Sequence, residues 1–275
     1  MSHTDFSVSM CIYEKDNPEW LSAAIESITT QTVVPKEIVL VVDGPITDEL
    51  ESIAKKCEAD ALYKVIRLPK NQGQGNARRI GLSACSNELV AIMDSDDISV
   101  SNRFENQLKK FENDDTLDVV GGNITEFIGS PENSVGNRNV FTDDESIKRD
   151  LKKRCPMNLV SVIFKKSSVE KAGGFIDWYC EEDYYLWVRM AMAGMRFANV
   201  PDTVVNVRVG KEMYKRRGGW KYFKSEARLQ GFMKKNRIIG LNTYIVNVAE
   251  RFIVQVLLPN KIRGWVFRKF AREKD

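Results

Sequence analysis

Three carboxylates stand within four residues at Asp94-Ser95-Asp96-Asp97, directly after the apolar run 88–93. Like charges this close repel one another, and the repulsion is costly unless a cation or water offsets it. Mg²⁺ and Mn²⁺ favour one or two carboxylates combined with phosphate oxygens and water. The tetrapeptide therefore indicates a divalent-cation site or, alternatively, a solvated acidic turn. A calcium EF-hand loop fits less well, because Ser99 stands where that loop needs glycine.

The segment 71–79 (NQGQGNARR) places a glycine-containing loop before a helix that carries Arg78 and Arg79. Backbone N–H groups at the start of a helix attract phosphate, and arginine adds two-pronged hydrogen bonding. The loop matches neither the dinucleotide-binding fingerprint nor a Walker A loop. A phosphate site and a plain turn both remain open from this segment alone.

Further polar residues follow other predicted strands. Tyr13 and Glu14 come after the first strand, and Asp43 comes after the second. Ligands of an open parallel sheet bind beyond the carboxyl ends of its strands. Tyr13 could stack on a base, and Asp43 could accept a hydrogen bond from a base or a ribose. Either residue alone is more often structural, so their convergence with the acidic tetrapeptide is the stronger signal.

The run Glu181-Glu182-Asp183 opens another predicted helix and is followed by Tyr-Tyr-Leu-Trp. Acidic residues in a first turn complement the helix dipole, which is a purely structural explanation. Alternatively, one of these carboxylates could act as a general base above the edge of the sheet.

The elements that must position these residues alternate in the first half of the chain. Apolar and β-branched runs predict strands at 6–12, 37–42, 61–68 and 88–93. Helical spacing of apolar residues predicts helices at 17–28, 47–57, 76–85 and 102–112. This order predicts an α/β fold with a doubly wound, mostly parallel sheet flanked by helices.

The second half is mixed, and its end is basic. We expect strands at 119–127, 159–164 and 204–209, a loop at 128–141, and helices at 166–172 and 181–193. Two amphipathic helices follow at about 219–235 and 243–258. Residues 1–207 carry a charge of −10 and residues 208–275 a charge of +13, which together give the net +3. A basic helical extension on an acidic body predicts contact with something anionic.

Composition excludes several classes of protein. The single histidine, His3, is at the N-terminus, which argues against a Ser-His-Asp triad or a histidine zinc site. The five cysteines are widely spaced without a CxxC pair, as expected for reduced thiols in a cytosolic protein. We expect neither a signal peptide nor a membrane-spanning segment. No recognition motif accompanies the basic charge, so we expect no nucleic-acid partner.

The segments 8–32, 37–45, 71–99 and 181–187, taken together and in order, resemble a family 2 glycosyltransferase with the GT-A fold. The resemblance extends over about residues 6–209. It implies a catalytic domain at 1–209, in which 1–100 binds the nucleotide-sugar and 101–209 binds the acceptor. It also implies a UDP-sugar donor, a divalent cation (Mn²⁺ or Mg²⁺) and inversion at the anomeric carbon.

The resemblance also assigns nucleotide contacts by position. Tyr13 would stack on the uracil, Asp43 would hold the base, and Arg78 would contact the nucleotide or its phosphates. Where the family usually has Ala-Arg-Asn, this chain has Ala77-Arg78-Arg79. The other predicted contacts with substrate or nucleotide are Glu14, Ser95, Glu182 and Trp187.

For the cation and the chemistry, the resemblance implies that Asp96 ligates the metal while Asp94 faces the ribose or the metal. Asp183 matches the family's catalytic base, in its usual context after Glu182. Many relatives have a histidine shortly after this chain's Arg208, but here the sequence continues with valine and glycine. No histidine can therefore complete a metal site there.

The segment 213–219 and the basic tail resemble a narrower group, the bacterial transferases that build O-antigen or exopolysaccharide repeat units. Those enzymes use a sugar linked to undecaprenyl diphosphate at the cytoplasmic face of the membrane. The resemblance favours glucose or galactose transfer with a β-linked product, ahead of N-acetylhexosamine transfer. The interleaved basic and aromatic residues of 210–275 suit a peripheral helix on an anionic leaflet, although solvated helices packed on the body would look similar.

Two other classes of function are weaker. A catalytically silent, nucleotide-binding scaffold subunit would have no reason to keep clustered carboxylates, whose repulsion is costly. A nucleotidyltransferase would need a glycine-rich first loop, and residues 13–16 (YEKD) are no such loop.

Overall fold

The computed structural model describes residues 4–210 and 218–258. Within these residues nine strands form one sheet, ordered β3-β2-β1-β4-β8-β6-β9-β5, with β7 paired to β6. The strands are β1 Phe6–Ile12, β2 Glu37–Val42, β3 Tyr63–Arg67, β4 Leu89–Met93, β5 Ile98–Ser99, β6 Val119–Phe127, β7 Ser134–Arg138, β8 Ile163–Lys165 and β9 Phe197–Arg208. The helices are α1 Pro18–Thr29, α2 Asp48–Glu58, α3 Gln74–Ala84, α4 Arg103–Asn113, α5 Asp144–Leu151, α6 Lys166–Lys171, α7 Glu182–Met192, α9 Trp220–Lys235 and α10 Leu241–Phe252, with a 3₁₀ turn η1 Leu159–Ser161 and a π turn η2 Ile253–Leu257.

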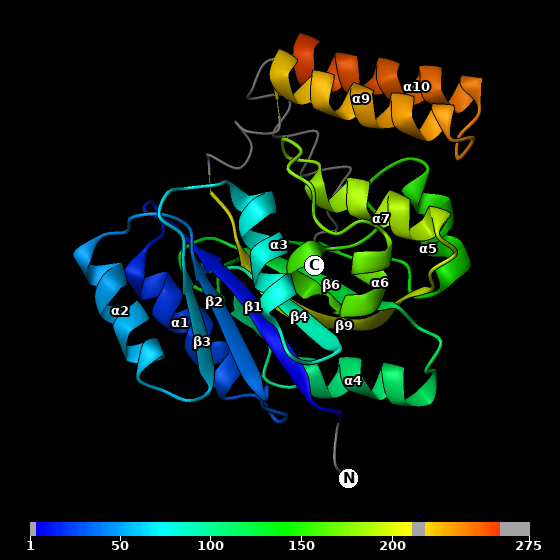
Figure 1. Cartoon of the computed structure of the whole chain (residues 1–275). Helices are drawn as coiled ribbons and strands as arrows, with labels where there is room; N and C mark the ends of the chain where they lie inside the picture. The colour runs from blue at the N-terminus through cyan, green and yellow to red at the C-terminus, as the bar shows by residue number, and fades with distance from the viewer. Residues whose placement is uncertain (1–3, 211–217, 259–275) are drawn as a thin grey trace.

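The four N-terminal strands β3, β2, β1 and β4 are parallel neighbours. Helices cover both faces of this part of the sheet (Figure 1). In β2, Ile38 and Leu40 join the core beneath α1, α2 and α4, whereas Val39 and Val41 join the core on the α3 and α7 side. Burial on both faces explains why these strands are continuous apolar runs rather than alternating ones. The predicted α/β fold is confirmed.

The other half of the sheet mixes directions. The strand β8 is antiparallel to both of its neighbours, β4 and β6, while β6 and β9 are parallel. The strand predicted at 159–164 is wrong in its first half, where Ser161 Oγ donates to Asn158 O at 2.7 Å and closes the turn η1. The loop predicted at 128–141 contains β7, and α5 was not predicted at all.

Glycines let α3 lie close to its neighbours. A Cβ atom on Gly81 would be 2.6 Å from the Oγ atom of Ser9 in β1, and one on Gly75 would be 3.0 Å from the backbone of Asp177. Real Cβ atoms are essentially never found as close as 2.6 Å to another heavy atom. The glycine at position 81 therefore permits the contact between α3 and β1. The close approach brings the first turns of α3 to the carboxyl ends of the parallel strands.

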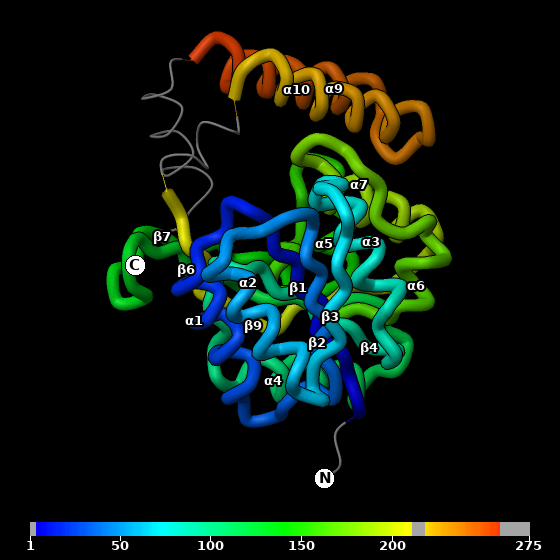
Figure 2. Tube along the Cα trace, turned by 60° about the vertical axis from the view of Figure 1, so that its left-hand side comes forward, coloured from blue at the N-terminus to red at the C-terminus, as the bar shows by residue number. Residues whose placement is uncertain are grey.

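The two predicted C-terminal helices are confirmed as α9 and α10, which form a hairpin that lies across the molecule beside α7 (Figures 1 and 2). Ser225 Oγ donates to the Tyr179 carbonyl at 2.6 Å, and Asn247 Nδ2 donates to the Lys152 carbonyl at 2.8 Å. None of the helices in the described ranges is long and apolar enough to cross a bilayer. The predicted features at 211–217 and 259–275 lie outside the described residues.

Candidate active site

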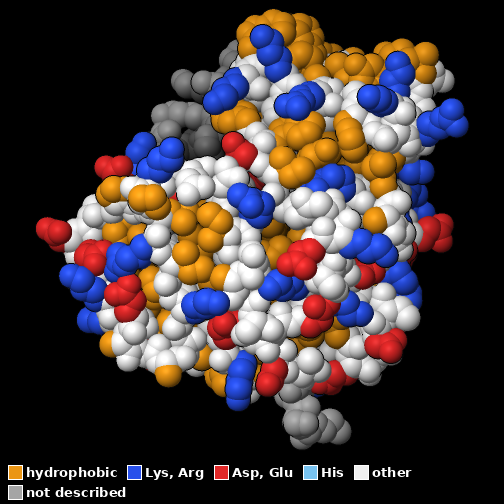
Figure 3. Space-filling model, in the orientation of Figure 1, with side chains coloured by type: hydrophobic (Ala, Val, Ile, Leu, Met, Phe, Trp, Pro, Cys, Tyr) orange, Lys and Arg blue, Asp and Glu red, His pale blue; other side chains and the backbone are white. Residues whose placement is uncertain are grey.

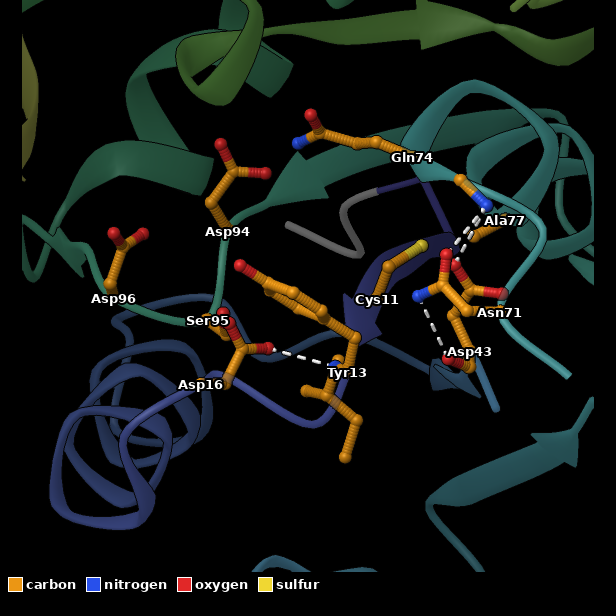
Figure 4. Close-up of a pocket in the computed structure, with 12 residues that line it drawn as sticks. Cys11, Tyr13, Asp16, Asp43, Asn71, Gln74, Ala77, Asp94, Ser95 and Asp96 are labelled. Atoms are coloured by element: carbon orange, nitrogen blue, oxygen red, sulfur yellow. Dashed lines mark hydrogen bonds between the residues drawn. The ribbon is translucent and has the colours of Figure 1, made fainter. Parts of the chain in front are cut away.

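A cavity of about 370 Å³ opens at the carboxyl ends of β1, β2 and β4. Figure 4 shows the side chains that the strand ends and the adjoining loops direct toward it. The twelve residues that line it are Cys11, Ile12, Tyr13, Asp16, Asp43, Asn71, Gly73, Gln74, Ala77, Asp94, Ser95 and Asp96. Five predicted site residues, Tyr13, Asp43, Asp94, Ser95 and Asp96, are therefore brought together.

Tyr13 and Asp16 form the wall that follows β1. The Tyr13 side chain is 41% exposed, and the Tyr13 N–H donates to Asp16 Oδ2 at 3.0 Å. Burial raises the pKa of Asp16, with a further contribution from the charge of Asp94. Sequence reasoning missed Asp16, although its place three residues after Tyr13 matches a side chain that caps the turn.

Asp43 orders the glycine-containing loop. Its side chain is buried, and its two carboxylate oxygens accept from the N–H groups of Gln72 at 2.7 Å and Gly73 at 3.1 Å. Gly44 has φ +90°, and a Cβ there would be 2.5 Å from Asn71 N, so only glycine fits this crossing of two loops. Asp43 thus fixes the pocket wall opposite Asp94, and a contact of Asp43 with a base stays a prediction.

Arg78 joins three elements behind the pocket. Its Nη2 donates to Asp94 Oδ1 at 2.9 Å and its Nη1 donates to Glu182 Oε1 at 3.0 Å. Burial alone would lower the pKa of Arg78, yet the two carboxylates raise it above its ordinary value, so the guanidinium stays charged. The network links α3, the turn after β4 and the first turn of α7. Contact of Arg78 with a nucleotide stays a prediction.

Three acidic side chains are crowded together in the acidic turn (94–97). Burial, followed by the charges of Asp94 and Asp16, raises the pKa of Asp96 to about 6. Within the described ranges, no group of three or more acidic, cysteine or histidine side chains is close enough to hold an ion alone. The donor set therefore suits a cation held by one or two carboxylates together with oxygens from a bound diphosphate.

Asp183 lies in the first turn of α7, next to Glu182. Its Oδ1 accepts from the N–H of Tyr184 at 2.7 Å, and its Oδ2 accepts from the Cys155 thiol at 3.6 Å. Burial, and then the charge of Asp183, raises the pKa of Cys155 well above its ordinary value, so the thiol stays protonated and able to donate. Asp183 itself does not line the cavity. The hydrogen bond between Glu182 and Arg78 connects α7 to the cavity wall.

Two predicted contacts lie elsewhere. Trp187 is 0% exposed and packs edge-on against Phe197 of β9, with ring centroids 6.4 Å apart. It lies one turn farther along α7 than Asp183, where the sheet covers the helix, and it is not among the residues that line the cavity. Glu14 is exposed to solvent and is not among the residues that line the cavity, since the turn closed by Asp16 directs it outward.

Comparison with known proteins identifies the class. The family model described as "Glycosyl transferase family 2" matches residues 7–169, and the chain belongs to that family. An uncharacterized glycosyltransferase of Haemophilus influenzae is 38% identical over 98% of this chain and 99% of its own length. The UDP-Gal:alpha-D-GlcNAc-diphosphoundecaprenol beta-1,3-galactosyltransferase of Escherichia coli is 36% identical over 97% and 96%. The amylovoran biosynthesis glycosyltransferase AmsE of Erwinia amylovora is 33% identical over 96% and 98%.

Solved structures agree on the fold. A mannosyltransferase from Pyrobaculum calidifontis, in complex with GDP-Man and Mn²⁺, matches with a TM-score of 0.62 over 95% of this chain and 72% of that one. TarS of S. aureus matches with a TM-score of 0.59 over 96% of this chain and 48% of the TarS chain. Both are 18% identical to this chain, so they bear on the fold alone. The expected GT-A fold and the glycosyltransferase class are confirmed.

Proposed function

We propose that the protein transfers a hexose, with galactose and glucose favoured, from a UDP-sugar to a sugar hydroxyl on an undecaprenyl-diphosphate-linked acceptor. The observation that carries the proposal is the single cavity that gathers Tyr13, Asp43 and two residues of the acidic turn, Asp94 and Asp96. The name of the 36% identical relative from E. coli states both kinds of substrate. The role we infer for the protein is one step in O-antigen or exopolysaccharide repeat-unit synthesis.

The donor would lie along the carboxyl ends of β1, β2 and β4. Tyr13 offers an exposed ring on which uracil can stack, and Asp43 lies across the cavity from the acidic turn. Asp96 and Asp94 would hold Mn²⁺ or Mg²⁺. Such a cation, when bound, neutralises charge that develops on the departing diphosphate. Arg78 keeps Asp94 in place from behind the cavity.

Asp183 would act as the general base. It would take the proton of the acceptor hydroxyl as the hydroxyl oxygen attacks the anomeric carbon from the face opposite the departing UDP. An α-linked donor then gives a β-glycoside. The N–H of Tyr184 and the thiol of Cys155 orient the carboxylate for this step. The adjacent Glu182, held by Arg78, ties the base to the donor pocket.

A donor screen tests the proposal. The purified chain is mixed with UDP-galactose, UDP-glucose or UDP-N-acetylhexosamines and a synthetic lipid-diphosphate sugar, and NMR of the product gives the linkage. We expect transfer of a hexose in β linkage, loss of turnover in excess chelator, and recovery with Mn²⁺ or Mg²⁺. Preferred use of an N-acetylhexosamine donor would support the alternative transfer reaction. Neither transfer nor donor hydrolysis under any condition would support the silent scaffold subunit.

Because the proposed acceptor is linked to a lipid, we infer peripheral docking of the protein on the cytoplasmic face of the membrane through the C-terminal hairpin. Apolar side chains on the outside of the hairpin are at least half exposed: Trp220, Leu241, Ile245, Val246, Ile253 and Leu257. The exposed basic residues of the hairpin are Lys221, Lys224, Arg228, Lys234, Lys235 and Arg237. Among the described residues 218–258, Glu250 is the single exposed acid. Apolar and basic side chains predominate over the hairpin in Figure 3.

The spacing along α10 and η2 suits a helix that lies in the plane of an anionic leaflet. Leu241 and Ile245 lie one turn apart on α10, and Ile253 and Leu257 begin and end η2, so exposed apolar side chains recur along the length of this segment. Each cation near such a surface adds about 1 kcal/mol of attraction. The hairpin therefore combines the two forces that interfacial helices use, burial of apolar side chains and attraction to anionic lipid.

Substitution of serine for both Ile245 and Leu257 should weaken co-sedimentation with vesicles of mixed neutral and anionic lipid about tenfold, which corresponds to about 1.4 kcal/mol. The matched control is Val34→Ser, which removes an equally exposed apolar side chain from the body of the protein. Wild-type recovery of the double variant with vesicles would show that the hairpin does not dock on lipid.

A further inference from the structure

Arg208, the last residue of β9, contacts the acidic turn through both its backbone and its side chain. The backbone N–H donates to Asp97 Oδ1 at 2.8 Å, and the side-chain Nε–H donates to the Asp96 carbonyl at 3.1 Å. A third donor, Nη1, reaches the carbonyl of Gly129, beyond the end of β6, at 2.5 Å. One arginine thus fixes two consecutive residues of the turn to a neighbouring loop.

The guanidinium of Arg208 also lies between two aromatic rings. Its central carbon is 4.5 Å from the ring centroid of Trp20 and 4.6 Å from that of Phe127. Trp20 comes from α1 and is 40% exposed, whereas Phe127 is buried at the end of β6. A planar guanidinium can stack on both faces and still donate from its edge, which an ammonium group cannot do. We call Arg208 together with Trp20 and Phe127 the clamp. The clamp joins α1, β6 and β9 to the acidic turn.

The clamp separates the carboxylates of the turn into two groups. Asp97 is buried, accepts from the backbone of Arg208, and does not line the cavity. Asp94 and Asp96 do line it. Because Nε donates to the Asp96 carbonyl, the peptide group between Asp96 and Asp97 is held in one orientation, with the Asp96 side chain on the cavity side. Three hydrogen bonds and two aromatic contacts of Arg208 thus hold the turn in this arrangement.

We propose that Arg208 is a positioning residue that sets the affinity of the Asp94 and Asp96 pair for the divalent cation of the UDP complex. The inference rests on the proposed function, since it concerns the same cation. Lysine at this position keeps the positive charge but loses the planar stack and the fixed fork of donors. Arg208→Lys therefore removes contacts that hold the turn in position but keeps the positive charge beside it.

The test titrates Mn²⁺ into the UDP-loaded full-length protein and follows free Mn²⁺ by electron paramagnetic resonance, without acceptor and without turnover. We expect Arg208→Lys to weaken Mn²⁺ binding about tenfold, with hexose transfer at saturating Mn²⁺ reduced less than about threefold. The matched control is Arg149→Lys on α5, where the arginine is likewise stacked, 6.0 Å from the Phe141 ring centroid, but away from the cavity. The control should bind Mn²⁺ like the wild type.

Wild-type Mn²⁺ affinity in folded Arg208→Lys would overturn the inference, and so would a fall in kcat with unchanged Mn²⁺ affinity. Absence of Mn²⁺ binding to the wild-type UDP complex would instead overturn the cation role itself, so the two failures are distinguishable. If Arg208→Lys does not fold, Trp20→Leu removes one face of the stack at a half-exposed position. That variant should weaken Mn²⁺ binding about threefold, and unchanged binding would again overturn the inference.

Discussion

Asp183→Asn should reduce the turnover of hexose transfer by about 10²- to 10⁴-fold while UDP binds as it does to the wild type. Asparagine has almost the same shape and can still accept from the N–H of Tyr184, but its amide cannot take a proton. The loss should therefore appear in kcat. Initial rates with the lipid-linked acceptor measure turnover, and calorimetric titration with UDP measures the affinity for UDP.

Asp48→Asn is the matched control for this substitution, since Asp48 also lies in the first turn of a helix, α2, but is exposed and belongs to neither the cavity nor the Arg78 network. The control should keep wild-type turnover. Near-wild-type turnover in Asp183→Asn would mean that another group accepts the proton. Loss of UDP binding in that variant would mean that the substitution disturbs the pocket through Glu182 and Arg78.

Arg78→Met should lower the free energy of unfolding by about 3–5 kcal/mol, because removal of one partner leaves uncompensated buried charge. The side chain of Arg78 is 6% exposed, and those of its partners Asp94 and Glu182 are 34% and 14% exposed. Such a loss is a large part of the roughly 5–15 kcal/mol that stabilises a typical domain. Urea denaturation followed by circular dichroism measures it.

Arg67→Met provides the comparison. Arg67 also contacts two acids, Glu51 and Glu58, but its side chain is 37% exposed. Water screens these pairs, so the loss should be less than about 1 kcal/mol. Adding Glu182→Gln to Arg78→Met should recover part of the larger loss, since one unpaired carboxylate disappears. A loss below about 1 kcal/mol for Arg78→Met would show that the network contributes little to stability.

The cavity at the carboxyl ends of the strands could be predicted from sequence because its geometry follows from local rules. Apolar runs mark the parallel strands, and their carboxyl ends lie at one edge of the sheet. Tyr13, Asp43 and Asp94 each come immediately after such a run, so their meeting in one cavity required no knowledge of the loops. The glycine-containing loop follows from another local pattern, since its glycines lead directly into a helix that carries Arg78 and Arg79.

Contacts between residues far apart in the chain could not be predicted. The pairing of Arg78 with Glu182 spans 104 positions, and that of Arg208 with Asp97 spans 111. No local pattern encodes either pair, since each depends on how the mixed half of the sheet closes on the parallel half. The burial of Trp187 could not be predicted for a related reason: the family resemblance groups it with Asp183, but only the fold shows that β9 covers it.

The position of β8 restricts how such enzymes can exchange parts by recombination. Its residues pair with β4 on one side and with β6 on the other, for example Phe164 with Val90 and with Val119. A crossover just after β4 would pair β4 from one parent with β8 from another. A crossover between β9 and α9 is milder, because it leaves every strand pair of the described sheet within one parent, and it has to match only the helix packing of Leu229 and Met233 against α7. Shuffled descendants should therefore inherit the sheet whole and exchange the helical hairpin.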